Sequence, residues 1–349
     1  MPRHLIAALA LAALSACGDG QPFFEDPDDG DGGGGGGDDG CAICGDPDLP
    51  PGTEEPSASG GIFRYEDIDE AGGGYVESVI YNSGDDTFFV DNLAFDGDNI
   101  YARGTAVSTL ADPDGAGPLP GYAVYEAGDF ELDPLTGAAI EQFGYRAIYG
   151  VSTNTTVVDG VTVPMSQFAI VRTGDYIPYG FGGFVYERNG TVTIPVTGQA
   201  RFTGEYAGVR VFQNRGGLEF TRADITVDID FRDFNSGNGV RGRLTNREAF
   251  DIDGSAIGLG TGDDDLQLPT VVFELGPGIM TNSGEISSGV VSNILNDQGA
   301  LEIYEEGTYF GILGGPDANE IVGVIVMESQ DPRFSGITAQ ETGGFIVYR

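Results

Sequence analysis

Hydrophobic and polar residues alternate in short runs along most of this chain, from Gly61 to Arg349. No window in this region shows the 3.6-residue period that an amphipathic helix would need. The clearest alternation lies in Ala223–Phe234, where one face would carry Ile225, Val227, Ile229 and Phe231 and the other Thr226, Asp228, Asp230 and Arg232. This pattern predicts a β-strand with one buried and one solvated face.

Turn signals separate further β-rich runs. Asn189-Gly190 lies in the middle of Phe184–Ile194 and predicts a two-residue hairpin, while Tyr75–Val90 predicts a hairpin with a longer turn. Short strands with Gly-rich turns and almost no helix favour antiparallel sandwiches or closed barrels, so the predicted fold class is all-β. Other strands are expected at Gln167–Thr173, Gly239–Phe250, Thr270–Leu275, Leu301–Gly311, Glu320–Glu328 and Gly344–Tyr348.

The strand-rich region is long for one such unit, so we expect two domains, residues 61–197 and 198–349, with the boundary near Pro195–Gly198. Ala111–Gly121 and Gly254–Leu268 are rich in Asp, Gly and Pro and are expected to be surface loops. The Asp263–Asp265 cluster is either a solvated loop tip or a cation site. The polar strand faces carry Asp, Glu, Thr and Arg, so we expect a soluble body rather than a membrane barrel.

The N-terminus carries an apolar run, Leu5–Leu14, directly after Arg3 and His4. It is too short to span a bilayer but suits the hydrophobic region of a signal peptide. Leu14-Ser15-Ala16-Cys17 resembles the lipobox of bacterial lipoproteins, which implies removal of residues 1–16 and acylation of Cys17. Gly18, in place of Asp, is similar to the pattern of lipoproteins sorted to the Gram-negative outer membrane. The alternative is an ordinary secretory signal in which Cys17 is incidental.

A Gly- and Asp-rich segment follows. Residues 18–60 contain 12 acidic residues and no Arg. Such a segment cannot bury enough apolar surface to offset the entropy of ordering it, so residues 17–60 are predicted to form a disordered tether. Cys41 and Cys44 lie within it. A structural disulfide between them is favoured over a redox or metal-binding pair, because no helix is expected there to activate a thiol.

Composition limits the chemistry of the chain. All 16 basic residues are Arg, the one His is His4 in the predicted signal peptide, and the net charge is −39. A body this acidic repels nucleic acid and anionic lipid; cations and basic proteins are the expected electrostatic partners, unless the charge serves solubility alone. Without His or Lys, the mature chain cannot form a Ser-His-Asp triad, a His-ligated zinc site or a Schiff base.

The C-terminal half contains a family resemblance. Gly198–Phe212, Ile225–Phe231 and Gly307–Val326 resemble the barrel lobe shared by transferrin-binding protein B-like and factor H-binding protein-like surface lipoproteins. Tyr309-Phe310 lies a few residues earlier than in the family pattern, and Val322 replaces a frequent Gly. A first motif, G-x-A-x-[FY]-x-G, is matched by Gly198, Ala200, Phe202 and Gly204, and a second, G-P-x-A-x-E-[IL]-x-G, by Gly315, Pro316, Ala318, Glu320, Ile321 and Gly323.

The resemblance implies a small antiparallel β-barrel for residues 198–349 and a β-rich handle-like domain for residues 61–197. The matched residues look structural, since Gly204 would permit close strand approach and Gly315-Pro316 is turn chemistry. The resemblance also implies a surface-exposed outer-membrane lipoprotein that captures an external protein.

The lead hypothesis is therefore a non-enzymatic binding protein for an external protein or solute, anchored in the outer membrane through Cys17, with no catalytic residue and no cofactor. Two alternatives stay open. One is an acidic envelope or cohesion protein that binds calcium, whose melting temperature would rise with calcium. The other is a polysaccharide hydrolase that uses two close carboxyl groups.

Overall fold

The computed structural model describes residues 49–91, 93, 100–111, 121–176, 179–234, 237–258, 267–277, 279–296 and 298–349. Every helix or strand assigned among them is a β-strand, so the predicted all-β class is confirmed. Cys17, Cys41, Cys44 and Asp263–Asp265 lie outside the described residues, as does most of the predicted tether. The part of the chain that the structure describes contains no helix that could cross a membrane.

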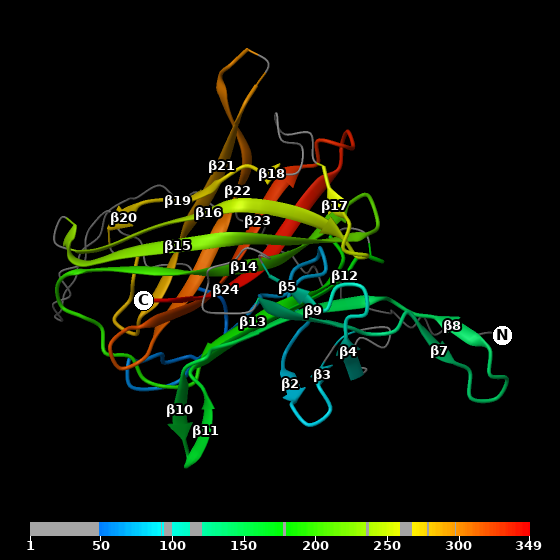
Figure 1. Ribbon diagram of the computed structural model, residues 1–349, viewed down its shortest axis with the longest axis horizontal. Helices are drawn as coiled ribbons and strands as arrows, with labels where there is room; N and C mark the ends of the chain where they lie inside the picture. The colour runs from blue at the N-terminus through cyan, green and yellow to red at the C-terminus, as the bar shows by residue number, and fades with distance from the viewer. Residues whose placement is uncertain are drawn as a thin grey trace, which may run out of the picture. The chain divides into compact units, whose positions relative to one another are not determined.

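Nine antiparallel strands form a first sheet, which we call the N-terminal sheet (Figure 1). Their order is β1-β13-β12-β9-β6-β4-β3-β2, and β5 pairs with β6. Two separate two-stranded hairpins, β7–β8 and β10–β11, arise from its connections. The strands of the sheet are β1 (Ile62–Tyr65), β2 (Val79–Asn82), β3 (Thr87–Val90), β4 (Ile100–Arg103), β5 (Thr109–Leu110), β6 (Tyr122–Glu126), β9 (Tyr145–Val151), β12 (Ser166–Thr173) and β13 (Phe181–Arg188); the hairpins are β7 (Phe130–Leu132) with β8 (Ala139–Glu141) and β10 (Thr155–Val158) with β11 (Val161–Pro164).

Eight strands, seven of them with 11 or more residues, form a closed antiparallel barrel. They run in the order β15-β14-β24-β23-β22-β21-β19-β16, and the pairing of β15 with β16 closes the ring. Because the ring is closed, these eight strands do not end in an open sheet edge to which a strand of another chain could pair. The barrel strands are β14 (Gln199–Gln213), β15 (Leu218–Phe234), β16 (Gly237–Asp251), β19 (Val271–Phe273), β21 (Glu285–Leu295), β22 (Leu301–Gly314), β23 (Glu320–Gln330) and β24 (Thr338–Tyr348); short β17 (Ala256–Ile257), β18 (Gln267–Leu268) and β20 (Gly276–Pro277) pair with β16.

One predicted hairpin is confirmed and one is wrong. The Tyr75–Val90 prediction corresponds to β2 paired antiparallel with β3. The Asn189-Gly190 hairpin does not form, because β13 already has a partner on each side, β1 and β12, and offers no free edge to a returning strand. The chain instead leaves the sheet here, and Val192 forms a bridge to Gly315 of the barrel.

The barrel strands bury residues on both faces. In β23, Ile321 and Ile325 belong to the hydrophobic core inside the barrel. Their neighbours Val322 and Val324 belong to a second core, formed with residues of the N-terminal sheet such as Ile170. A third core of aromatic and aliphatic residues, among them Phe88, Tyr101, Tyr125, Tyr145 and Val171, stabilises the other face of the sheet. The sheet therefore covers apolar strips of the barrel that water would otherwise meet.

Buried polar contacts also join the sheet to the barrel. Arg188, only 1% exposed, donates hydrogen bonds to the carbonyl oxygens of Ser283 and Leu313 in the barrel region, at 2.9 and 2.7 Å. The same guanidinium donates to the carbonyl oxygens of Ser57 and Gly60 at 2.7 and 2.8 Å. Burial lowers the pKa of Arg188 to about 10. One side chain thus ties three segments of the chain together through carbonyl groups.

Candidate functional site

The residues that carry the family motifs come together at one end of the barrel. Thr203 of the first motif segment and Glu320 of the second both pair with Tyr348, so β14 and β23 lie on either side of β24. Ala200 and Phe202 point into the barrel core. A Cβ at Gly204 would lie 2.6 Å from the carbonyl oxygen of Ile346, so the position needs a glycine.

The second motif builds the turn between β22 and β23. Gly315 has a φ of 89° and Ala318 a φ of 50°, values in the left-handed region. Pro316 is exposed, whereas Ile321 is buried in the barrel core. A Cβ at Gly323 would overlap the carbonyl oxygen of Phe310. These residues shape the turn and the strand packing.

Glu320 makes a contact that the sequence pattern does not predict. Its carboxylate is fully buried and accepts hydrogen bonds from three side chains of the N-terminal sheet region. The donors are Ser152 Oγ at 2.7 Å, Asn154 Nδ2 at 2.6 Å and Ser166 Oγ at 2.6 Å. This motif residue therefore joins the barrel to the sheet rather than to a ligand.

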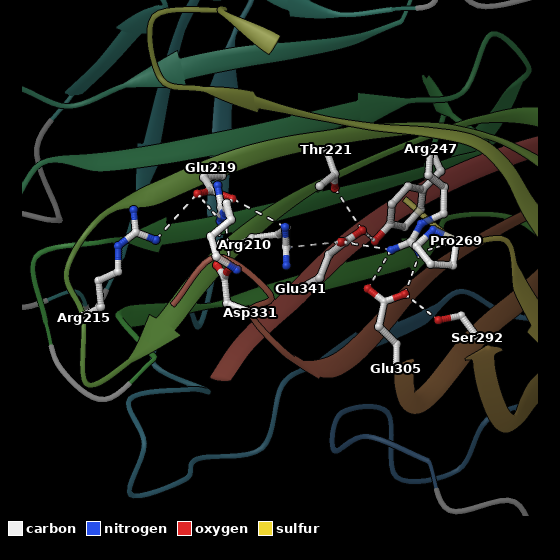
Figure 2. A network of polar contacts seen from close by, with 12 residues as sticks. Arg210, Arg215, Glu219, Thr221, Arg247, Pro269, Ser292, Glu305, Asp331 and Glu341 are labelled. Atoms are coloured by element: carbon white, nitrogen blue, oxygen red, sulfur yellow. Dashed lines mark hydrogen bonds and ion pairs between the residues drawn. The ribbon is translucent and has the colours of Figure 1, made fainter. Parts of the chain in front are cut away.

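Charged side chains occupy one end of the barrel interior (Figure 2). Arg247 donates to Glu305 at 2.6 and 3.0 Å and to Glu341 at 3.2 Å. Arg210 lies between Glu219 and Glu341, with nitrogen–oxygen distances of 3.5 and 3.9 Å. Burial opposes ionisation of Glu305, but the charge and hydrogen bonds of Arg247 hold the pKa of that carboxyl below its usual value. The network joins five strands and fills this part of the barrel with protein side chains.

A large hollow lies outside the barrel, against the outer face of β22 and β23. It has a volume of about 820 Å³ and extends to the loop that follows β1. Half-buried Phe310 and Val326 lie along it, and Ile68 and Ile303 are 63% and 59% exposed beside it. We call this hollow the acidic groove, because its lining includes Glu66, Asp67, Asp69, Glu306 and Glu328.

Most of these carboxylates lack a cationic partner among the described residues. Glu66 is the exception, since it accepts a 2.6 Å hydrogen bond from Arg172. Asp67 and Asp69 accept hydrogen bonds from nearby backbone amides, and Glu328 accepts one from Gln340 Nε2 at 3.3 Å. No hydrogen bond or ion pair of Glu306 to a described residue is found. No Arg is among the described residues that line the groove.

A second hollow of about 360 Å³ continues the acidic groove across β22. The two share Ile303, Glu306, Gly307 and Thr308, and the second adds Glu274 and Val290–Val291. Its described lining again contains no Arg. The outer face of β22 thus presents a continuous depression that combines exposed aliphatic side chains with carboxylates. Such a surface suits an elongated ligand that is both apolar and positively charged.

The two alternative functions that use carboxyl groups, polysaccharide hydrolysis and calcium binding, have less support. Burial raises the pKa of Glu187, which accepts a 2.5 Å hydrogen bond from Gln167 in a pocket of about 220 Å³ on the N-terminal sheet. The described lining of this pocket contains no second carboxyl group, and a glycosidase needs two. The described residues also contain no cluster of three or more His, Cys, Asp and Glu that could hold a metal ion.

Comparisons with known proteins give structural likeness only. No family model matches the chain, and no curated protein matches it. A solved structure described as a surface lipoprotein is 12% identical, with a TM-score of 0.28, and the match covers 55% of this chain and 80% of that one. Transferrin binding protein B from Haemophilus parasuis, as a double mutant, is 11% identical with a TM-score of 0.29, and the match covers 65% of this chain and 45% of that protein.

An intact transferrin binding protein B with both lobes gives 13% identity and a TM-score of 0.29, with 63% of this chain and 41% of that protein covered. This chain therefore spans less than half the length of those transferrin-binding structures. The matches name the same class of lipoprotein that the two sequence motifs resemble. At these identities and TM-scores the matches indicate no function for this chain. The functional proposal below is based on the acidic groove.

Proposed function

We propose that this chain is a non-enzymatic binding protein that holds a basic, partly apolar segment of an external protein in the acidic groove. The observation that carries the proposal is the lining of the groove: five carboxylates, four of them without a cationic partner among the described residues, beside aliphatic and aromatic side chains, and no Arg among the described residues that line it. A chain of net charge −39 also attracts a basic partner over distance and speeds its association.

The location in the cell is a further part of the proposal. Acylation of Cys17, anchoring in the outer membrane and an outward-facing body are supported by the apolar run, the small residues before Cys17 and Gly18 after it. Digestion of intact cells by protease tests the outward orientation. We expect loss of the barrel while a periplasmic control protein survives; protection of the barrel until the cells are permeabilised would place it on the inner side.

A defined peptide tests the groove. The probe is a fluorescent synthetic peptide of alternating Arg and Leu, and the comparison peptide has Glu in place of Arg. We expect the Arg peptide to bind the purified chain, with an affinity that falls as salt rises, and the Glu peptide not to bind. In Glu306→Gln/Glu328→Gln the affinity should fall about 2- to 30-fold, since each exposed ion pair contributes about 0.2–1 kcal/mol.

A matched variant separates the groove from overall charge. Glu302→Gln/Asp317→Asn removes two exposed carboxylates that do not line the groove, so it changes the net charge by the same amount. Its affinity should stay within about twofold of the unmodified chain, because only long-range attraction is reduced. Equal losses in the two double variants would refute the groove as the binding site and leave non-specific charge attraction.

A further inference from the structure

The β7–β8 hairpin is a second projecting surface, separate from the acidic groove. All six residues of its two strands are exposed, and these strands pair only with each other in the described sheet topology. Phe130, Leu132, Leu135 and Ile140 are 53%, 60%, 93% and 45% exposed. In Figure 1 the hairpin extends beyond the N-terminal sheet. Phe130 and Leu132 lie on the same face of the hairpin, opposite Glu141 and Ala139, whereas Ile140 lies opposite Glu131 on the other face. Apolar side chains gathered in this way on an exposed face mark a site that a partner covers.

The hairpin is a well-defined element. Asp133 Oδ1 accepts hydrogen bonds from the backbone amides of Leu135 and Thr136, at 2.9 and 2.6 Å, and from the Thr136 hydroxyl at 2.9 Å. The amide of Gln142 donates to the carbonyl oxygen of Asp129 at 2.8 Å and closes its base. This turn presents Leu135 at its tip, so little ordering entropy would be lost when a partner covers it.

The charges around the apolar residues identify the kind of partner. Residues 128–144 contain Asp129, Glu131, Asp133 and Glu141 and no Arg. Four carboxylates beside the apolar residues oppose insertion into an anionic lipid surface, whose potential repels them. They also oppose a second copy of this chain, which would bring together two bodies of net charge −39. Charge complementarity favours a different protein with basic residues at the contact.

We propose that the β7–β8 hairpin docks into an apolar pocket, bordered by Lys or Arg, on a partner protein. Phe130 and Leu132, on one face of the hairpin, and Leu135 at its tip fill the pocket, and the carboxylates of the hairpin face the basic border. This contact is independent of the acidic groove and needs none of its residues.

Site-specific photocrosslinking tests the docking. The probe is a benzophenone amino acid placed at position 135 of the full chain on its native cells, and the matched control carries it at position 157. Val157 is 66% exposed on β10 of the β10–β11 hairpin, another projecting hairpin. We expect a discrete protein adduct from position 135 that position 157 does not give, with Lys or Arg near apolar residues in the crosslinked peptide of the partner.

Each other outcome overturns the proposal. Adducts to lipid, to a second copy, or to a partner peptide without basic residues would refute the assigned chemistry, and no adduct above the control would refute docking. Leu132→Ser in the chain with the probe at position 135 should reduce the adduct about tenfold or more. The variant should fold, because this hairpin contributes to none of the three cores. Glu306→Gln/Glu328→Gln should leave the adduct unchanged, which separates this contact from the groove.

Discussion

Removal of the Glu320 carboxylate tests the idea that polar contacts hold the barrel to the N-terminal sheet. In Glu320→Ala the hydroxyls of Ser152 and Ser166, which are 6% and 1% exposed, lose their acceptor, and so does the Asn154 amide. The variant therefore leaves buried donors unsatisfied on the sheet side, while the barrel turn keeps its own backbone hydrogen bonds.

The expected loss in the free energy of unfolding follows from these contacts. An unsatisfied buried donor costs about 1–3 kcal/mol, so the two serine hydroxyls together cost about 2–6 kcal/mol. Release of a buried carboxylate offsets part of this loss, because burial of an unpaired charge is itself unfavourable. We expect the free energy of unfolding to fall by about 3 kcal/mol in Glu320→Ala. Glu320→Gln keeps one acceptor oxygen and should lose about half as much.

Urea unfolding measures the effect. The chain has no Trp, so tyrosine fluorescence and far-ultraviolet circular dichroism are the signals. Asp317→Asn, an exposed change in the same turn region, is the control and should stay within about 0.5 kcal/mol of the unmodified chain. A loss of less than about 1 kcal/mol in Glu320→Ala would refute the reasoning, because Ser152 and Ser166 would then have found other partners at no cost.

Two further predictions concern buried side chains. Tyr122, Tyr186 and Tyr206 are at most 2% exposed, and burial raises the pKa of each phenol. The folded state keeps these protons, whereas unfolded tyrosines lose theirs above about pH 10. The free energy of unfolding that these three groups contribute is therefore fully present below that pH. Above it, the free energy of unfolding should fall by about 4 kcal/mol per pH unit. Absorbance from the buried tyrosinates should rise together with loss of circular dichroism; ionisation of all 15 tyrosines with the circular dichroism unchanged would contradict this. In Gly344→Ala the new Cβ would overlap the Phe168 ring between sheet and barrel, so urea unfolding should show a loss of about 1–3 kcal/mol. Gly128→Ala, with only one neighbouring atom at 3.8 Å, should show no such loss, and equal effects would argue against the steric explanation.

The all-β class could be predicted because strand alternation is a local property. Ile225, Val227, Ile229 and Phe231 are 1%, 2%, 1% and 5% exposed, as the pattern in Ala223–Phe234 indicated. The Asn189-Gly190 error had a different origin. A turn signal says that the chain can reverse, but whether a strand has a free edge depends on β1 and β12, which come from elsewhere in the sequence.

The acidic groove and the charged barrel interior could not be predicted from the sequence. Arg210 lies between Val209 and Val211 in β14, and both neighbours belong to the core between barrel and sheet while Arg210 faces the barrel interior. Alternation alone would have assigned the arginine to solvent. The groove combines the loop after β1 with the outer faces of β22 and β23, segments that are adjacent only in the folded chain.

The double burial of β24 has a consequence for how the molecule assembles. Phe345 and Val347 complete the barrel core, whereas Ile346 between them completes the core against the N-terminal sheet. β24 also pairs with β14, across nearly all of the barrel sequence. This pairing is non-local, so β24 is expected to form late in folding. Both the barrel core and the core against the N-terminal sheet stay incomplete until it forms. Until β24 pairs, the N-terminal sheet has an uncovered apolar face, and aggregation through this face competes with folding.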